Sequence, residues 1–234
     1  MSTAQRTVMV TGAAGNLGQA VAAAFASQGA RLVLIDRQLE LLRLAFGEDS
    51  DDRQLLAADL LDGPQVAAAV DAAVARFGRI DVLCNLAGSF RMGEAVHETA
   101  PGTWDFLLDI NAGTLLNTAR AVVPHMLQSG GGKIVNVGAH AAHKGMAQMG
   151  AYCAAKSVVI RLTEAMAAEL RVKNINVNCV LPTIINTPEN RAAMPAADPG
   201  LWVEPKDLAS VIVFLASDSA KAVHGAALPV TGLS

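Results

Sequence analysis

Short apolar runs rich in β-branched residues alternate with longer alanine-rich segments along this chain. The runs have the length of strands, whereas the longer segments carry apolar residues at helical spacing. Strands are predicted at residues 7–11, 31–35, 54–58, 80–84, 133–137 and 175–181, and helices at residues 16–28, 64–77, 103–128, 152–172 and 205–217. Alternation of this kind is typical of an α/β fold in which helices cover both faces of a parallel sheet.

One segment breaks this alternation. Residues 182–205 contain five prolines and show neither helical nor strand periodicity. Because ordinary connections are much shorter, this segment is predicted to be a lid or a substrate-binding loop. The alternative, a surface excursion without a role, stays open.

The composition favours one folded domain that acts on a small molecule. The 234 residues are 52% hydrophobic and 17% charged, which fits a single domain spanning residues 1–234. The net charge is −3, and no run of lysine or arginine is longer than two residues. The chain therefore lacks the basic surface that nucleic acids or anionic lipids require.

Apolar runs such as residues 211–216 are too short to span a membrane, which takes about 20 residues. No secretory signal is recognised at the N-terminus, so a cytoplasmic location is expected. The three cysteines, Cys84, Cys153 and Cys179, are widely spaced without nearby histidines. They predict buried reduced thiols rather than a disulfide framework or a metal site.

A glycine-rich turn lies between the first predicted strand and the first predicted helix. Gly12, Gly15 and Gly18 of the sequence TGAAGNLG allow backbone N–H groups to approach a pyrophosphate at the helix N-terminus. Asp36 ends the second strand, 18 residues after Gly18. A carboxylate there hydrogen-bonds the ribose hydroxyls and repels a 2′-phosphate, so NAD is predicted rather than NADP. The neighbouring Arg37 favours a phosphate but is opposed by Asp36, and a solvated turn residue remains the alternative for Asp36.

Tyr152 and Lys156 lie four residues apart at the start of a predicted helix, and Tyr152 is the only tyrosine. This spacing places both side chains on one helix face. An ammonium beside a phenol lowers the phenol's pKa, so Tyr152 is predicted to exchange protons near neutral pH. A Y-x-x-x-K spacing by itself also arises by chance.

Together with Asn111, these motifs make the whole chain resemble the compact, single-domain branch of the short-chain dehydrogenase/reductase family. The resemblance implies a Rossmann-like, doubly wound, seven-stranded parallel sheet, hydride transfer with nicotinamide, and a homodimer or homotetramer. It implies that Tyr152, Lys156 and Asn111 are catalytic, with Asn111 holding a water that leads protons to Lys156. It assigns cofactor binding to Gly12, Gly15, Asn16, Leu17, Gly18, Asp36, Arg37, Asp59, Leu60, Asn85, Ala87, Gly88, Tyr152, Lys156, Pro182 and Thr187.

Several residues of those motifs have individual roles in the family. Asp59 matches the acidic residue beside the adenine, and residues 85–88 match a motif that stabilises the central sheet. Thr187 is implied to contact the nicotinamide amide. Four positions depart from the family pattern. In three of them, Asn16 replaces a common glycine, Leu86 a usual asparagine and Thr183 a usual glycine.

The most consequential departure is Ala139, thirteen residues before Tyr152, where the family normally has a serine that hydrogen-bonds the reacting carbonyl. Losing such a donor costs about 10²–10³ in rate. Three explanations are open. His140 or His143 replaces the donor, the substrate needs no polarised carbonyl, or the chain binds the cofactor as a sensor or scaffold without efficient chemistry.

The second explanation is supported by a local similarity to the dihydropteridine reductases of the family, in residues 15–18, 138–142 and 181–198. Those enzymes also lack the serine and use NADH to reduce a quinonoid dihydropterin, although Asn111 departs from that subgroup. Ala139, His140, Met146 and Met149 are the candidate substrate residues, with core or interface packing as the alternative for the methionines.

The sequence as a whole therefore predicts an NAD(H)-dependent oxidoreductase. Its substrate is expected to be a small carbonyl compound or alcohol, or a conjugated C=N system. Reduction of a quinonoid dihydropterin and non-catalytic NAD(H) binding are the alternatives.

Overall fold

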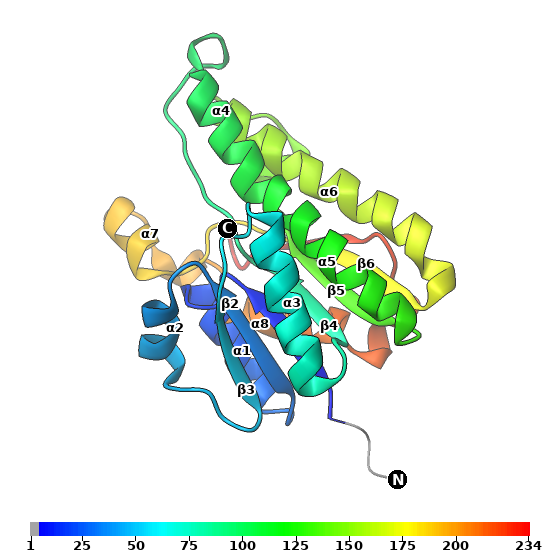
Figure 1. Ribbon diagram of the computed structural model, residues 1–234. Helices are drawn as coiled ribbons and strands as arrows, with labels where there is room; N and C mark the ends of the chain where they lie inside the picture. Colours follow the sequence, from blue (N-terminus) through cyan, green and yellow to red (C-terminus); the bar gives the residue numbers. More distant parts are fainter. Residues whose placement is uncertain (1–4) are drawn as a thin grey trace.

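The computed structural model describes residues 5–234 and contains a seven-stranded parallel sheet (Figure 1). Its strands are β1 Thr7–Thr11, β2 Arg31–Asp36, β3 Arg53–Ala57, β4 Val82–Asn85, β5 Gly132–Val137, β6 Ile175–Pro182 and β7 Ala227–Val230. The strand order is β3-β2-β1-β4-β5-β6-β7. The predicted doubly wound fold is confirmed, including the seven strands implied by the family resemblance.

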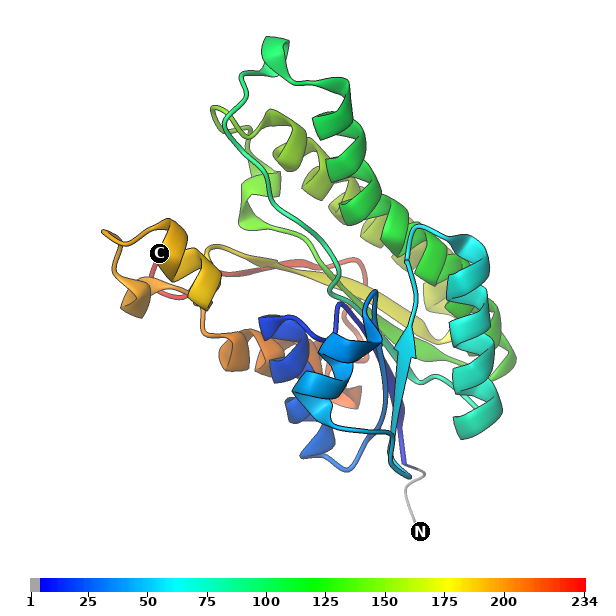
Figure 2. The same ribbon diagram turned by 60° about the vertical axis from the view of Figure 1, so that its left-hand side comes forward.

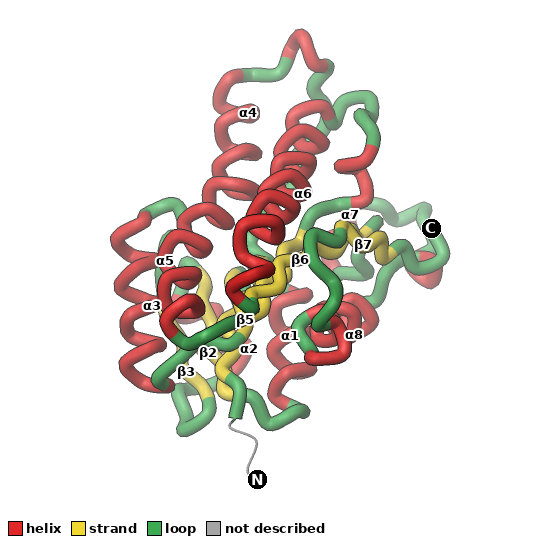
Figure 3. Tube along the Cα trace, turned by 90° about the vertical axis from the view of Figure 1, so that its right-hand side faces the viewer, coloured by secondary structure: helices red, strands yellow, loops and turns green. Residues whose placement is uncertain are grey.

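Helices cover both faces of this sheet (Figure 3). The α-helices are α1 Asn16–Ala26, α2 Leu39–Phe46, α3 Gly63–Phe77, α4 Pro101–Leu108, α5 Thr114–Gln128, α6 Gly150–Leu170, α7 Pro188–Ala193 and α8 Pro205–Leu215. One core layer packs α1 and α8 on the sheet through side chains such as Phe25 and Ile212. The other packs α3, α5 and α6 on the opposite face through Val70, Val122 and Ala167. Because helices bury both faces of the sheet, its inner strands are apolar along their whole length instead of alternating between apolar and polar residues.

Strands β2 and β3 are added on one side of β1, and β4 to β7 are added on its other side, so the strand order changes direction at β1. In open α/β sheets, ligands bind at such a switch point, outside the carboxyl ends of the strands. Here that place lies between the turn after β1 and the loop after β4. The fold thus brings the glycine-rich turn next to residues 86–88.

Several elements differ from the predictions. The helix predicted at residues 103–128 is α4 and α5, joined by a π-helical turn at Asp109–Gly113. Residues 182–205 were predicted to lack periodic structure, but they contain the short α7 and a 3-10 turn at Pro199–Leu201. Both pieces begin with prolines, which suit a first helical turn but interrupt any longer pattern.

Two elements were not predicted at all. The eight-residue α2 buries only Leu42 and so carries a weak periodic signal. The four-residue edge strand β7 contains Pro229, which is tolerated only where one side of the strand is unpaired. Within residues 5–234, no helix is both long and apolar enough to cross a membrane.

Candidate active site

Packing within the protein explains two of the three glycines in the turn after β1. Gly12 has φ +64°, and a Cβ there would lie 3.0 Å from the Ala87 backbone. A Cβ on Gly18 would lie 2.4 Å from the Gly12 carbonyl oxygen. At Gly15, by contrast, the nearest atom would be the Gly12 oxygen at 3.4 Å. The space beside Gly15 is therefore left for a ligand, which fits a phosphate that approaches the backbone at the start of α1.

Asp36 lies beside this turn with its carboxylate held in place. Its Oδ2 accepts a hydrogen bond from the Ala14 N–H at 3.1 Å, and its Oδ1 accepts one from the Arg37 N–H at 2.8 Å. A hollow of about 450 Å³, here called the glycine-turn hollow, is lined by Ala14, Gly15, Gln19, Asp36, Leu41, Leu44 and Ala45. A fixed carboxylate beside an apolar wall suits the ribose and adenine of a dinucleotide. The residues present thus fit the predicted cofactor.

The loop after β4 is tied to β1 by Thr11. Its hydroxyl accepts hydrogen bonds from the Leu86 N–H at 3.1 Å and the Ala87 N–H at 3.4 Å. Asp59 stabilises its own turn, since its Oδ1 accepts the Leu61 N–H at 2.9 Å, and the adjacent Leu60 is buried. Neither Asp59 nor Leu60 lines the glycine-turn hollow.

The side chain of Asn85 belongs to a chain of buried polar side chains. Thr118 donates to Asn85 Oδ1 at 2.8 Å, and Asn85 Nδ2 donates to Asn136 at 2.9 Å. Asn136 in turn donates to Thr163 at 2.9 Å. These four side chains connect α5 to α6 through the middle of the sheet. The contacts support the sheet-stabilising role of Asn85, and its role in cofactor binding stays a prediction.

Lys156, Asn111 and Gly88 meet at the carboxyl end of β4. A Cβ on Gly88 would lie 2.7 Å from Asn111 Oδ1 and 3.2 Å from Lys156 Nζ, so glycine is needed for these side chains to approach. Lys156 is buried, and its Nζ donates to the Val137 carbonyl oxygen at 3.0 Å. Asn111 lies in the π-helical turn, and its Nδ2 donates to the carbonyl oxygens of Ser89 and Leu107. A π-helical turn is frequent at functional sites.

Tyr152 differs electrostatically from what the sequence predicts. Burial raises the pKa of Tyr152 to about 12, with a smaller contribution from Cys153. Burial also lowers the pKa of Lys156 to about 8. The predicted lowering of this phenol's pKa by Lys156 is therefore wrong, because the effect of burial dominates. At pH 7 the hydroxyl is therefore neutral and suited to donating a proton.

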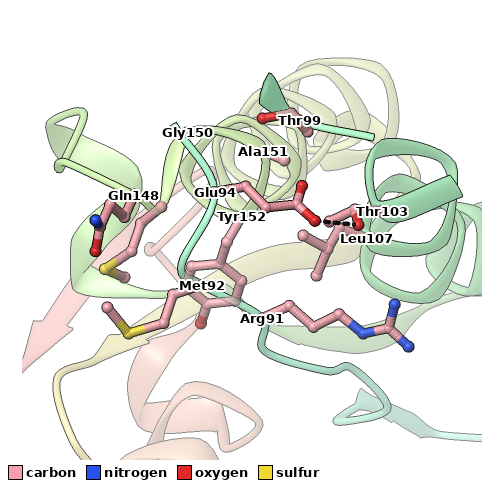
Figure 4. Close-up of a pocket in the computed structure, with 11 residues that line it drawn as sticks. Arg91, Met92, Glu94, Thr99, Thr103, Leu107, Gln148, Gly150, Ala151 and Tyr152 are labelled. Atoms are coloured by element: carbon pink, nitrogen blue, oxygen red, sulfur yellow. Dashed lines mark hydrogen bonds between the residues drawn. The ribbon is translucent and has the colours of Figure 1, made fainter. Parts of the chain in front are cut away.

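A cavity of about 240 Å³, here called the tyrosine cavity, adjoins Tyr152 (Figure 4). The ring of Phe90 contacts the Tyr152 ring edge to face, with the centroids 4.8 Å apart. The cavity is lined by Arg91, Met92, Glu94, Thr99, Thr103, Leu107, Gln148, Met149, Gly150, Ala151 and Tyr152. Of the predicted substrate residues, only Met149 lines it. The other lining residues were missed because they come from irregular loops, from α4 and from the first residues of α6, none of which carries a motif of its own.

The remaining substrate candidates lie in the segment after β5. Ala139 is buried and extended, with φ −157°. His140 and His143 form an exposed 3-10 turn with their ring centroids 5.7 Å apart, and Met146 is exposed. No hydrogen bond joins either histidine to Tyr152 within residues 5–234. Substitution of the missing serine by a histidine stays a prediction.

The proline-rich segment, residues 182–205, reaches the glycine-rich turn. Pro182 is buried at the end of β6, and Thr187 caps α7 by accepting the Asn190 N–H at 3.2 Å. Asn16 Nδ2 donates to the Glu189 carboxylate at 2.9 Å. Figure 2 shows α7 projecting beyond the sheet, as do the outer ends of α4 and α6. The segment thus contacts the glycine-rich turn, and its role as a lid or substrate-binding loop stays a prediction.

Burial of Lys156 has a measurable consequence for stability. Its pKa falls from 10.5 to about 8 on folding, which corresponds to about 3 kcal/mol at about 1.4 kcal/mol per pH unit. Between those pH values the unfolded chain binds the proton and the folded protein does not, so the free energy of unfolding rises with pH. Relative to a Lys156→Met variant, the wild type is expected to gain about 3 kcal/mol between pH 7 and pH 10.5.

Urea unfolding of both proteins across this pH range measures the gain. Burial raises the pKa of Cys84 to about 12, which lowers stability above pH 9, but this effect is common to both proteins and cancels in the difference. A difference between wild type and variant that is constant with pH would contradict a buried, destabilised ammonium.

A doubly wound sheet with a glycine-rich turn at its switch point, beside a tyrosine and a buried lysine, defines a dinucleotide-dependent oxidoreductase. The family model for short chain dehydrogenases matches residues 6–197. The chain is also 36% identical to D-threitol dehydrogenase of Mycolicibacterium smegmatis, over 97% of this chain and 92% of that protein. The protein belongs to the short-chain dehydrogenase/reductase family, as the sequence motifs predict.

Solved structures agree with this assignment. The 3-ketoacyl-(acyl-carrier-protein) reductase of Brucella melitensis complexed with NADH has a TM-score of 0.87 and 29% identity, covering 97% of each chain. Carveol dehydrogenase of Mycobacterium avium in complex with NAD has a TM-score of 0.85 and 29% identity, covering 98% of this chain and 97% of that one. A nicotinamide cofactor is thereby supported, whereas the local similarity to dihydropteridine reductases is not shown. The homodimer or homotetramer stays a prediction.

Proposed function

We propose that this protein uses NAD(H) to interconvert a small alcohol and the corresponding carbonyl compound. The observation that carries the proposal is the meeting of Asn111 and Lys156 at Gly88, one helical turn from Tyr152, in the loop whose Ala87 packs against Gly12 of the glycine-rich turn. The fixed carboxylate of Asp36 supports NAD rather than NADP. Two solved relatives hold NADH and NAD and another structural neighbour holds NADP, so the proposal of NAD rests on Asp36.

In this proposal a bound nicotinamide supplies or takes up the hydride, and the chain supplies the proton. The neutral phenol of Tyr152 donates a proton to the carbonyl oxygen during reduction. The Nζ of Lys156 donates to the Val137 carbonyl oxygen, and it would also hold a ribose hydroxyl of the nicotinamide nucleotide. Asn111 fixes the loop after β4 through Ser89, and a water at Asn111 that leads protons to Lys156 is part of the proposal.

The position of Ala139 supports a second candidate. A side chain without a donor suits an electron-poor C=N substrate, such as a quinonoid dihydropterin, because such a substrate accepts hydride without building full charge on an oxygen. The same alanine also agrees with a non-catalytic NAD(H) sensor or scaffold. The buried Lys156 and Asn111 beside Tyr152 favour catalysis, because a pure binding protein has no use for them.

The direct test follows NADH consumption with diketones, hydroxyketones, quinones and quinonoid dihydropterin, and follows NAD reduction with polyols. Polyols belong in this panel because a relative is named for D-threitol. We expect turnover with at least one carbonyl compound or alcohol. Tight NADH binding with no turnover across the panel would overturn the enzymatic proposal in favour of the sensor.

Restoring the missing donor distinguishes the two kinds of substrate. Ala139 is buried in an extended conformation that serine also adopts, so Ala139→Ser is expected to fold normally. If the substrate is a carbonyl compound, kcat is expected to rise about ten-fold, because the hydroxyl stabilises charge on the carbonyl oxygen. The control is Ala139→Cys, which is close to serine in size but is a weak donor. An unchanged kcat in Ala139→Ser would favour the C=N substrate.

A further inference from the structure

The outer part of the proline-rich segment, residues 187–198, is weakly held by packing. No side chain of α7 is buried, and most residues of this outer part are exposed. The base of the segment is closed, because Ile185 pairs with Val203 and the Asn186 side chain donates to the Glu204 carboxylate. A part with few buried contacts opens with little change in free energy. Any contact between α7 and the rest of the protein therefore decides where this part lies.

One hydrogen bond joins this outer part to a distant element. Asn16 Nδ2 donates to Glu189 Oε2 at 2.9 Å, and this contact is here called the Asn16–Glu189 clasp. Within residues 5–234, the other hydrogen bonds of residues 187–198 stay inside the proline-rich segment. Asn16 stands where the family commonly has glycine, which has no side chain to form this bond. The clasp therefore depends on a residue that departs from the family pattern.

The clasp closes a bridge across the sheet. Asn16 follows β1 and Glu189 follows β6, and β4 and β5 lie between these two strands. Neighbouring strands are about 4.8 Å apart, so β1 and β6 are about 14 Å apart. The proline-rich segment therefore passes the carboxyl ends of β4 and β5 to reach the glycine-rich turn. The clasp thus lies at the switch point beside β1, where a dinucleotide would enter.

The carboxylate of Glu189 supplies a negative charge at the N-terminus of α1. This helix has no acidic residue in its first turn, and no side chain caps its N-terminus. Hydrogen bonds from its own backbone N–H, from Thr187 and from Asn16 lower the pKa of Glu189, so the carboxylate is ionised at pH 7. Within the described residues 5–234, Glu189 forms no ion pair with a cationic side chain. Its uncompensated charge lies where a helix N-terminus attracts an anion.

A pyrophosphate would be attracted to the same place. The N–H groups at the start of α1 and the space left at Gly15 are the features that fit a phosphate. A phosphate and the Glu189 carboxylate are both negative, so each disfavours the other at the N-terminus of α1. The hydrogen bond of the clasp and the charge of Glu189 therefore both oppose the entry of a nucleotide.

We propose that the Asn16–Glu189 clasp is an autoinhibitory contact, which holds α7 against the glycine-rich turn until a dinucleotide displaces the Glu189 carboxylate. This inference rests on the proposed function, because it takes the glycine-rich turn as the place of the pyrophosphate. It adds that the free protein is held in a state that admits nucleotide slowly, and that nucleotide binding releases α7.

Stopped-flow fluorescence of NADH measures the inhibition directly. Glu189→Ala is expected to raise the association rate about ten-fold and to change the dissociation rate by less than about two-fold, so the dissociation constant falls about ten-fold. Glu189→Gln keeps an oxygen that accepts the hydrogen bond but loses the charge, and should give a smaller gain. Asn16→Ala removes the other partner. A protein with both alanines should bind NADH no faster than Glu189→Ala, because one bond is broken in each case.

Asp198→Asn is the matched control for charge. Asp198 is an exposed carboxylate in the same segment, and asparagine keeps an oxygen for the Gly200 N–H that Asp198 accepts. This variant should bind NADH at the wild-type rates. An equal gain in Asp198→Asn would show a general effect of charge in the segment and would overturn the clasp.

Trypsin reports the position of α7 without relying on nucleotide kinetics. Arg191, in α7, is the only lysine or arginine in residues 182–205. Glu189→Ala should speed cleavage after Arg191 in the free protein, because cleavage follows the population of the open form. NADH should speed the same cleavage in the wild type by a similar factor, because the coupling of two binding events is reciprocal.

Protection of Arg191 by NADH, or weaker NADH binding in Glu189→Ala, would show that the clasp closes over bound nucleotide and would overturn the inference. Unchanged association rates in Glu189→Ala would overturn it as well. Turnover of a carbonyl compound that Tyr152→Phe abolishes would uphold the proposed function in both cases. A wild-type protein that binds no NADH would overturn both.

Discussion

Replacing Tyr152 with phenylalanine is expected to lower turnover by about 10³-fold while NADH binding changes by less than about two-fold. The substitution removes only the hydroxyl that donates the proton to substrate. The ring remains packed against Phe90, so the surrounding structure should be kept. Single-turnover rates with NADH measure the loss, and quenching of NADH fluorescence measures binding.

Titration of the same hydroxyl provides an independent check. Tyr152 is the only tyrosine in the chain, so the ultraviolet absorbance change of phenol ionisation reports this group alone. Without nucleotide, we expect the phenol to titrate near pH 12. Turnover that persists in Tyr152→Phe would exclude the hydroxyl as proton donor, and a titration near pH 7 would show that Lys156 outweighs burial.

Replacing Asp36 with asparagine is expected to weaken NAD(H) binding by about 10²-fold and to bring NADPH to a similar affinity. The reason is that the carboxylate offers charge-assisted hydrogen bonds to ribose hydroxyls and repels a 2′-phosphate. The side chain is already oriented by the N–H groups of Ala14 and Arg37, so little of its binding energy is lost in ordering it. Dissociation constants for both reduced nucleotides provide the measurement.

Glu40→Gln is the matched control for net charge. Glu40 is an exposed carboxylate in the first turn of α2, and it does not line the glycine-turn hollow. We expect this variant to bind NADH with nearly unchanged affinity. Wild-type protein that prefers NADPH, or Asp36→Asn that keeps the preference for NADH, would contradict NAD selection by Asp36.

Sequence alone predicts the elements whose apolar pattern is long and regular. The runs that became β1 and β6 and the segments that became α1 and α6 are of this kind. The glycine-rich turn is found because its three glycines lie between a predicted strand and a predicted helix. The break between α4 and α5 is not visible, because a π-helical turn inserts one residue per turn without interrupting an apolar segment. Likewise α2 and β7 are too short to show a period.

The Y-x-x-x-K spacing places Tyr152 beside Lys156, but it does not show how deeply either side chain is buried, and burial sets both pKa values. That depends on residues distant in sequence, such as Phe90 and Val137, which come from other elements. For the same reason, the tyrosine cavity has no signal in the sequence, because Arg91, Thr103 and Met149 are brought together only in the folded protein.

The buried chain from Thr118 through Asn85 and Asn136 to Thr163 has a consequence for divergence. Each of the four side chains is satisfied by its neighbours, so a single apolar replacement leaves a buried donor or acceptor unpaired, at about 1–3 kcal/mol. Two adjacent replacements remove both partners and cost less than their sum. The effect of a substitution at one of these positions therefore depends on its hydrogen-bonded neighbour. We expect the middle of this sheet to diverge in evolution by paired substitutions of neighbouring members of the chain.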